Sequence, residues 1–291
     1  MICAKWLGVC GKVPVYCAAR LSFSTAVKPE RTSMKRTLMS ALAATATFAT
    51  LASHASTASA DSASYPIEIT KRPLTLPAGV FQINGNATID LSKGAGTAIE
   101  LSPNVAYGVN DEVELSLTHQ GHGSLLFGPE GTKVYNGFGA DVTYWALKAP
   151  VGIAPHAGLD VGPFDPKFGF GVNVGSRFWY NFSDRVVLNA DPRIGFGVAN
   201  RAGGARDYLS VPVALLVQTT DNLGIRVESG IRGSLNGFGD TYSIPLGVAG
   251  IYAINHSVDL GARFTFTGLI NGADAGAFDG RNLGLFANIR L

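Results

Sequence analysis

The sequence predicts an all-β fold, an antiparallel up-and-down transmembrane β-barrel of about twelve strands. Apolar and polar residues alternate over segments of roughly 9–11 residues, the length that a tilted strand needs to cross a bilayer. Short turns rich in Asn, Asp and Ser join these segments at one end, and longer Gly-rich connections join them at the other. With 10% aromatic and 15% charged residues, the chain is also too apolar to be disordered.

The expected strands run from residue 80 to residue 291. They cover residues 80–91, 98–107, 112–119, 138–147, 151–161, 168–182, 185–198, 208–218, 223–233, 241–254, 258–267 and 282–291. An even number of strands places both ends of the barrel on one side of the membrane, and all the short turns then lie on that side. The long connections at 120–137, 199–207 and 268–281 lie on the other.

Alternation alone does not say which face of a strand points inward. In residues 223–233, for example, Ile225 and Val227 share one face, while Arg226 and Glu228 share the other. A soluble lipocalin-like barrel would bury the apolar face, whereas a membrane barrel turns it toward lipid. A polar face rich in Gly and in both charge signs favours the membrane barrel. So do aromatic residues beside the short turns, the expected interfacial girdle of Tyr107, Trp179, Tyr180 and Tyr252.

Residues 61–291 therefore resemble a bacterial outer-membrane β-barrel protein of the porin-like kind. The last strand, with Leu283, Leu285 and Ile289 on one face, resembles the recognition signal for the insertion machinery of such proteins, although the chain ends in Leu291 rather than Phe or Trp. The resemblance implies a Gram-negative outer membrane, contact with the bilayer and lipopolysaccharide, and insertion by that machinery. It concerns an architecture and carries no motif for one function.

The N-terminal region predicts export. A positive segment at Met34–Arg36, an apolar run at 38–52 and a small-x-small site at 58–60 together predict a signal peptide over residues 34–60, so that the mature chain begins at Asp61. Residues 1–33 are then an extension upstream of the true start, 61–78 a periplasmic lead, and 79–291 the barrel. All three cysteines lie in the extension, at positions 3, 10 and 17, and their spacing without histidine matches no zinc pattern.

Charge argues against a nucleic-acid partner. Residues 1–60 hold seven of the 23 Lys and Arg residues and one of the 21 acidic residues, which leaves 16 basic and 20 acidic residues in 61–291. The predicted mature chain therefore carries a net charge of about −4. We expect no nucleic-acid binding.

No motif in the sequence predicts an enzyme, a cofactor or a metal site. His256-Ser257 lies in a predicted short turn, where turn chemistry explains it better than catalysis on lipid. His119 and His122 lack a neighbouring carboxylate that would complete a metal site. Gly169, Gly171 and Gly175 are spaced as small residues on one strand face rather than as a nucleotide-binding loop.

The polar face is the candidate functional surface. Its charged residues are expected to line the lumen: Glu100, Glu114, Asp141, Asp160, Arg177, Asp191, Arg193, Arg226, Glu228, Arg232, Asp259 and Arg263. One interpretation is a narrow channel for small polar solutes or ions, in which a stripe of arginines faces acids across the lumen. The alternative is a closed structural or adhesive barrel that acts through its extracellular loops, with these charges as internal braces. A third interpretation, an outer-membrane lipid-modifying enzyme, lacks a suitably placed catalytic pair.

Five prolines fall inside expected strands, where each removes a ladder donor: Pro103, Pro155, Pro192, Pro212 and Pro245. We expect bulges at these positions or placement near the level of the lipid headgroups; the alternative is that the strand bounds differ there.

Overall fold

The computed structural model describes residues 65–92, 99–119, 125–128, 131–133, 137–162, 168–201, 207–272, 276 and 278–291. The expected extension and signal peptide lie outside these residues, as does His122. The strands are β1 (Phe81–Asp90), β2 (Ile99–Gly108), β3 (Val113–Thr118), β4 (Leu125–Gly128), β5 (Gly131–Lys133), β6 (Phe138–Tyr144), β7 (Val151–Val161), β8 (Phe170–Ser183), β9 (Val186–Ala190), β10 (Arg193–Ala199), β11 (Tyr208–Gln218), β12 (Leu223–Ser234), β13 (Ser243–Ala253), β14 (Val258–Asn271) and β15 (Arg281–Arg290).

The helices of the described residues are short: the 3-10 helix η2 (Ile69–Lys71) and the α-helix α2 (Phe238–Thr241). Neither they nor any other helix in this part of the chain is long and apolar enough to span a membrane.

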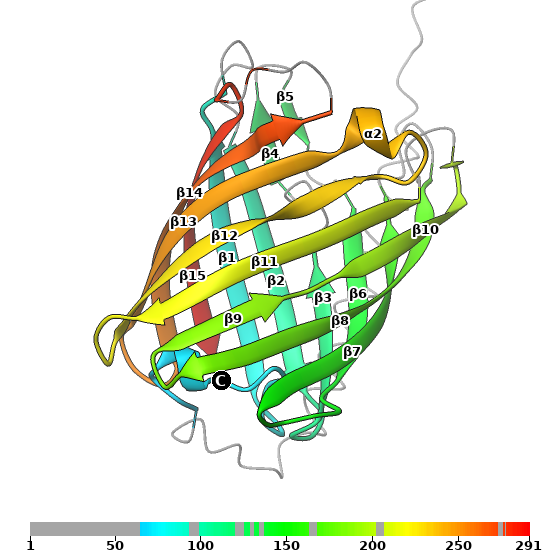
Figure 1. Ribbon diagram of the computed structural model, residues 1–291. Helices are drawn as coiled ribbons and strands as arrows, with labels where there is room; N and C mark the ends of the chain where they lie inside the picture. The colour runs from blue at the N-terminus through cyan, green and yellow to red at the C-terminus, as the bar shows by residue number, and fades with distance from the viewer. Residues whose placement is uncertain are drawn as a thin grey trace, which may run out of the picture. The chain divides into compact units, whose positions relative to one another are not determined.

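All neighbouring strands are antiparallel, and the sheet closes on itself because β1 pairs with β2 on one side and with β15 on the other. β9 and β10 share one position in the wall, since both pair with β8 and with β11. β3 pairs with the second half of β2, and β4 pairs with its first residues, so the two share one position in the wall. β5 pairs with β4 and is one further strand. The described residues therefore form a closed 12-strand barrel with one extra strand, as Figure 1 shows.

Short turns join β2 to β3, β8 to β9, β11 to β12 and β13 to β14 at one end of the barrel, where β1 begins and β15 ends. We call this the short-turn end; it is the lower end in Figure 1. Most strand bounds match the sequence prediction within a few residues, and β7 and β11 match it at both ends. The expected connection at 120–137 is the main difference, because it contains β4 and β5. Their apolar runs are too short to predict a membrane strand.

The exposed face of the wall is apolar. In β13, Val248 and Tyr252 keep 51% and 52% of their area exposed, whereas Ala249 and Ala253 fall to 2% and 0%. The same alternation leaves Ile225 of β12 and Leu260 of β14 exposed. A soluble barrel would bury such side chains around its axis, so the outer surface is one that suits lipid.

Three of the five in-strand prolines coincide with irregularities in the sheet. Pro192 lies in the break between β9 and β10. Pro212 faces Gly230, whose φ of 146° favours glycine. Pro245 lies at the register shift between β13 and β14. The other two keep regular antiparallel register: Pro103 and Pro155.

Candidate functional site: a charged lumen crossed by the N-terminal segment

Residues 65–78, which we call the plug segment, cross the short-turn end of the barrel (blue at the lower end in Figure 1). Gln218 at the end of β11 accepts a hydrogen bond from the first backbone amide of η2 at 2.8 Å. Asp259 near the start of β14 and Glu114 near the start of β3 bind other parts of the segment. Because these strands are far apart around the closed wall, a segment that contacts all three must cross the lumen.

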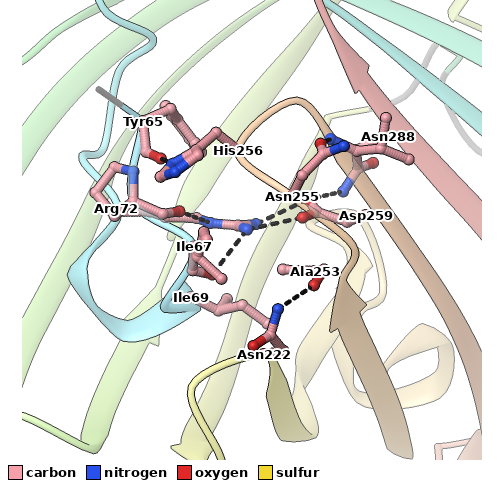
Figure 2. Close-up of polar contacts among 12 residues, drawn as sticks. Tyr65, Ile67, Ile69, Arg72, Asn222, Ala253, Asn255, His256, Asp259 and Asn288 are labelled. Atoms are coloured by element: carbon pink, nitrogen blue, oxygen red, sulfur yellow. Dashed lines mark hydrogen bonds and ion pairs between the residues drawn. The ribbon is translucent and has the colours of Figure 1, made fainter. Parts of the chain in front are cut away.

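Asp259 anchors the first half of the plug segment, as Figure 2 shows. Its buried carboxylate accepts two hydrogen bonds from the Arg72 guanidinium, at 2.8 and 2.7 Å, and a further one from Arg290 of β15. The Tyr65 ring lies 4.2 Å from the guanidinium carbon of Arg290 and 5.3 Å from that of Arg72. Two-point charged hydrogen bonds are strong and directional, so this contact fixes the segment to the last two strands.

The same contact explains His256, which the sequence analysis assigned to a turn. Its Nδ1 atom lies 2.6 Å from the carbonyl oxygen of Tyr65, and its own carbonyl accepts a hydrogen bond from Arg290. The Tyr65 side chain is a separate matter from this backbone contact: burial raises the pKa of its phenol, so the hydroxyl stays neutral. His256 is therefore engaged with the plug segment rather than directed at a lipid.

A second anchor holds the other half of the plug segment. Arg177 Nη1 donates to Glu114 at 3.0 Å and to the carbonyl of Leu74 at 3.1 Å, and Glu114 also accepts from the Leu76 amide at 3.0 Å. Gly108, the last residue of β2, lies against the segment. A Cβ atom there would come within 2.0 Å of the Pro77 carbonyl oxygen. Only glycine permits this close approach of two backbones.

Residues 61–78 were expected to be a polar periplasmic lead before the barrel, and their described part lies inside its short-turn end. The missed signal is apolar content. The segment contains more apolar residues than an exposed polar lead requires, and they lie beside Arg72 in sequence: Ile67, Ile69, Leu74 and Leu76. Their partners are scattered over four strands, so no local pattern predicts the contacts.

An acidic cluster lies on the lumen side of strands β6 to β10. His156 Nε2 lies 2.8 Å from Asp191 Oδ1, while its Nδ1 lies 3.8 Å from Asp141 Oδ1. Arg193 donates to the other oxygen of Asp191 at 2.7 Å. His156 is almost completely buried, and its ring contacts the Asp191 carboxylate directly while the Asp141 carboxylate lies beyond hydrogen-bond distance.

Asp160 extends this cluster toward the long-loop end. It accepts hydrogen bonds from Asn173 and from the Tyr208 hydroxyl, both at 3.1 Å. Three carboxylates, those of Asp141, Asp160 and Asp191, thus share this side of the lumen with the Arg193 guanidinium and the His156 ring.

Glycines make room for the cluster. A Cβ atom at Gly158 would come within 2.1 Å of Asp141 Oδ1, and one at Gly175 within 2.5 Å of His156 Nε2. The small-residue interpretation of Gly169, Gly171 and Gly175 thus has a physical reason at the last of these positions. Glycine in a strand commonly marks such a close approach.

A basic cluster lies on β12 and β14, separated from the acidic cluster by β11 in the strand order. Glu228 is shared between Arg226, at 3.1 Å from Nε, and Arg263, at 3.7 Å from Nη1. Both arginine side chains keep 41% of their area exposed although they share the strand face that points into the barrel. The lumen is therefore not filled around them.

The arginines that were expected to form one stripe do not all lie together. Arg193 pairs with Asp191 and belongs to the acidic cluster, because β10 lies beside β8 rather than beside β12. Arg232 of β12 is exposed and lies opposite Ser210. Glu100 lies on β2 opposite Thr88 of β1.

Three girdle candidates lie on the outer face near the short turns. Tyr180 and Tyr252 are exposed, and Tyr107 pairs with the exposed Leu115. Trp179 is a correction to the predicted girdle, since it lines an internal cavity and contacts the Trp145 ring at a centroid distance of 6.1 Å. Consecutive residues of a strand point to opposite faces, so Trp179 faces inward when Tyr180 faces outward.

The plug segment separates two cavities. The larger, of about 260 Å³, lies between the segment and strands β1 to β3, and the smaller, of about 170 Å³, lies on the side of β8 to β13. Pro73 and Leu74 line both. Among the described residues no group of three or more His, Cys, Asp or Glu side chains is placed to hold a metal ion, and His119 contacts Asn104 instead.

Comparison with solved structures identifies the class of fold. The chain is similar to the KdgM porin in complex with disordered oligogalacturonate, with a TM-score of 0.51 and 10% identity over 72% of this chain and 98% of that one. It is similar to the NanC porin, with a TM-score of 0.50 and 10% identity over 72% of this chain and 100% of that one.

An outer membrane channel from Pseudomonas putida F1 gives a TM-score of 0.51 at 10% identity, over 75% of this chain and 97% of that one. No family profile matches the sequence, and no curated protein sequence matches it. Likeness at this identity shows the fold alone. The chain has the fold of a porin-like outer-membrane β-barrel with 12 strands.

Proposed function

We propose that the chain is a channel of the bacterial outer membrane that passes small polar solutes and ions, with the plug segment narrowing its periplasmic end. One observation carries the proposal: Arg226 and Arg263 share the inward strand face, yet each stays 41% exposed. Charged side chains that remain open to water inside a closed wall line a polar passage. The apolar outer face and the porin-like fold support the membrane location.

The two clusters give this passage a transverse field. The acidic cluster spans β6 to β10 and the basic cluster lies on β12 and β14, so charges of opposite sign occupy different parts of the wall with β11 between them. Such a field aligns dipolar solutes and makes ion preference sensitive to single charges. The solute class would then be polar and small, because the plug segment leaves only limited cavities on either side.

A second candidate is a closed barrel that serves adhesion or envelope structure through its long loops. The observation that favours it is the anchoring of the plug segment on both sides, by Asp259 and by Glu114 with Arg177. A segment fixed in this way would seal the short-turn end if the remaining cavities do not connect. Nothing in the described residues favours a lipid-modifying enzyme, since His256 is engaged by Tyr65.

Purified protein in planar bilayers separates the two candidates. The channel predicts stepwise current at low protein concentration, with an ion preference that changes when Arg226 is replaced. The closed barrel predicts no current even at a high protein-to-lipid ratio. A shift in gel mobility on heating shows that the protein used in this test is folded.

A further inference from the structure

The larger cavity beside the plug segment has a lining that differs from the rest of the lumen. Amide and hydroxyl side chains from three strands face it: Gln82, Asn84, Asn104, Ser116 and Thr118. An amide offers both donors and acceptors, and a hydroxyl offers one donor and two acceptors. Resting on the proposed channel function, we propose that this cavity is a binding site for small uncharged polyhydroxyl solutes such as monosaccharides.

The charges at the cavity are already neutralised. Glu114 and Arg177 are its charged lining residues, and they bind each other at 3.0 Å. Their remaining contacts go to the plug backbone, at Leu74 and Leu76. A charged solute would find no free counter-charge among these groups, whereas a neutral one would leave the pair intact.

Hydrogen-bonding capacity remains at the cavity wall. The Ser116 hydroxyl is buried and has no partner among the described residues. Asn84, which is half-buried, accepts one hydrogen bond, from Gln82 at 2.9 Å. Buried polar groups normally have partners, so the unpartnered Ser116 hydroxyl in a cavity indicates a ligand or water that supplies one.

Size and chemistry distinguish this cavity from its neighbour. Its volume of about 260 Å³ is close to the lower limit of ~300–1,000 Å³ for sites that bind drug-sized ligands, which suits a single sugar ring. The smaller cavity, of about 170 Å³, is lined by Trp179, Leu216 and Ile251 together with Arg226 and Asn189. Its smaller volume and its two lining arginines, Arg72 and Arg226, suit a neutral sugar ring less well.

The test uses D-glucose as the probe and two matched variants. Asn84→Leu removes an amide from the larger cavity, and Asn189→Leu makes the same change in the smaller one. We expect the glucose concentration that blocks half of the single-channel current to rise about two- to tenfold in Asn84→Leu. This rise corresponds to the loss of one net hydrogen bond. We expect no change in Asn189→Leu. Ser116→Ala should act like Asn84→Leu, and gel mobility verifies folding of all three.

The inference is overturned if glucose blocks the parent and Asn84→Leu equally, if Asn189→Leu shows the larger change, or if gluconate blocks the parent at lower concentration than glucose. In each of these cases the channel itself would stand. A parent without current would instead end the channel proposal. Equilibrium dialysis of the detergent-solubilised protein with labelled glucose then decides the site alone: binding weakened by Asn84→Leu supports it, and no binding refutes it.

Discussion

Arg72 and Asp259, 187 positions apart in sequence, form a two-point ion pair at 2.8 and 2.7 Å that joins the plug segment to the last hairpin of the barrel. Arg290, which ends β15, binds the same carboxylate. Asp259 thereby links the plug segment to β15, the strand that pairs with β1 to close the sheet.

Replacing Asp259 should cost more stability than replacing Arg72. Asp259→Ala leaves two buried arginines without their carboxylate, and breaking a buried pair in this way costs about 3–5 kcal/mol. Arg72→Ala leaves Asp259 still paired with Arg290 and should cost less. Thermal unfolding of the purified barrels measures both. Lys71→Ala, at the exposed pair with Glu68, is the control and should unfold like the parent.

A methyl group at Gly108 should displace the plug segment. Its Cβ would lie 2.0 Å from a backbone oxygen of Pro77, which no side-chain rotation relieves. We expect Gly108→Ala to expose residues 65–78 to a protease added from the short-turn side. Gly85→Ala meets nothing within 4 Å and should leave the segment protected. Equal cleavage of the two variants would contradict the observed packing.

The orientation of the wall predicts opposite effects for two neighbouring residues. Ile225 is exposed on the outer face, and an arginine at a lipid-facing midplane position costs about 2–4 kcal/mol. Ile225→Arg should therefore impair assembly in bilayers. Leu260→Arg should impair it less, because Leu260 pairs with the girdle residue Tyr252 near the interface, where the cost falls to about 0–1 kcal/mol. Arg226→Ala should retain heat-resistant mobility, since its side chain lies in the open part of the lumen. The reverse ranking would mean that the apolar face points inward.

Reversing one charge of the basic cluster should change ion preference. Arg226→Glu places a carboxylate beside Glu228 and so turns this part of the lumen negative. The reversal potential in a salt gradient should move toward that of a cation-preferring channel. Thermal unfolding of the same variant is the control. A large loss of stability without a change in selectivity would show that Arg226 braces the wall.

The strands were predictable because their pattern is local. Alternation in 151–161 and 208–218 predicts β7 and β11 at both ends, and the short turns fix the direction of every strand. The break at Pro192 was anticipated for the same reason, since proline removes a ladder donor wherever the strand lies.

The plug segment was not predictable, because its structure depends on partners from distant strands. Nothing near Arg72 in sequence signals Asp259, and nothing near Leu76 signals Glu114. Alternation assigns the charged residues to the polar face of each strand, but it does not predict how they group. Arg193 joined the acids because the order of strands around the barrel, rather than their alternation, decides which side chains meet.

Single-channel conductance of the parent and of a chain lacking residues 65–78 tests the central claim most directly. The deletion leaves Asp259 paired with Arg290 and Glu114 paired with Arg177, so the barrel should still fold. We predict small current steps from the parent and larger steps from the deleted chain, because the plug segment narrows an open lumen. Equal steps from both, or silence from both when folded, would contradict the account.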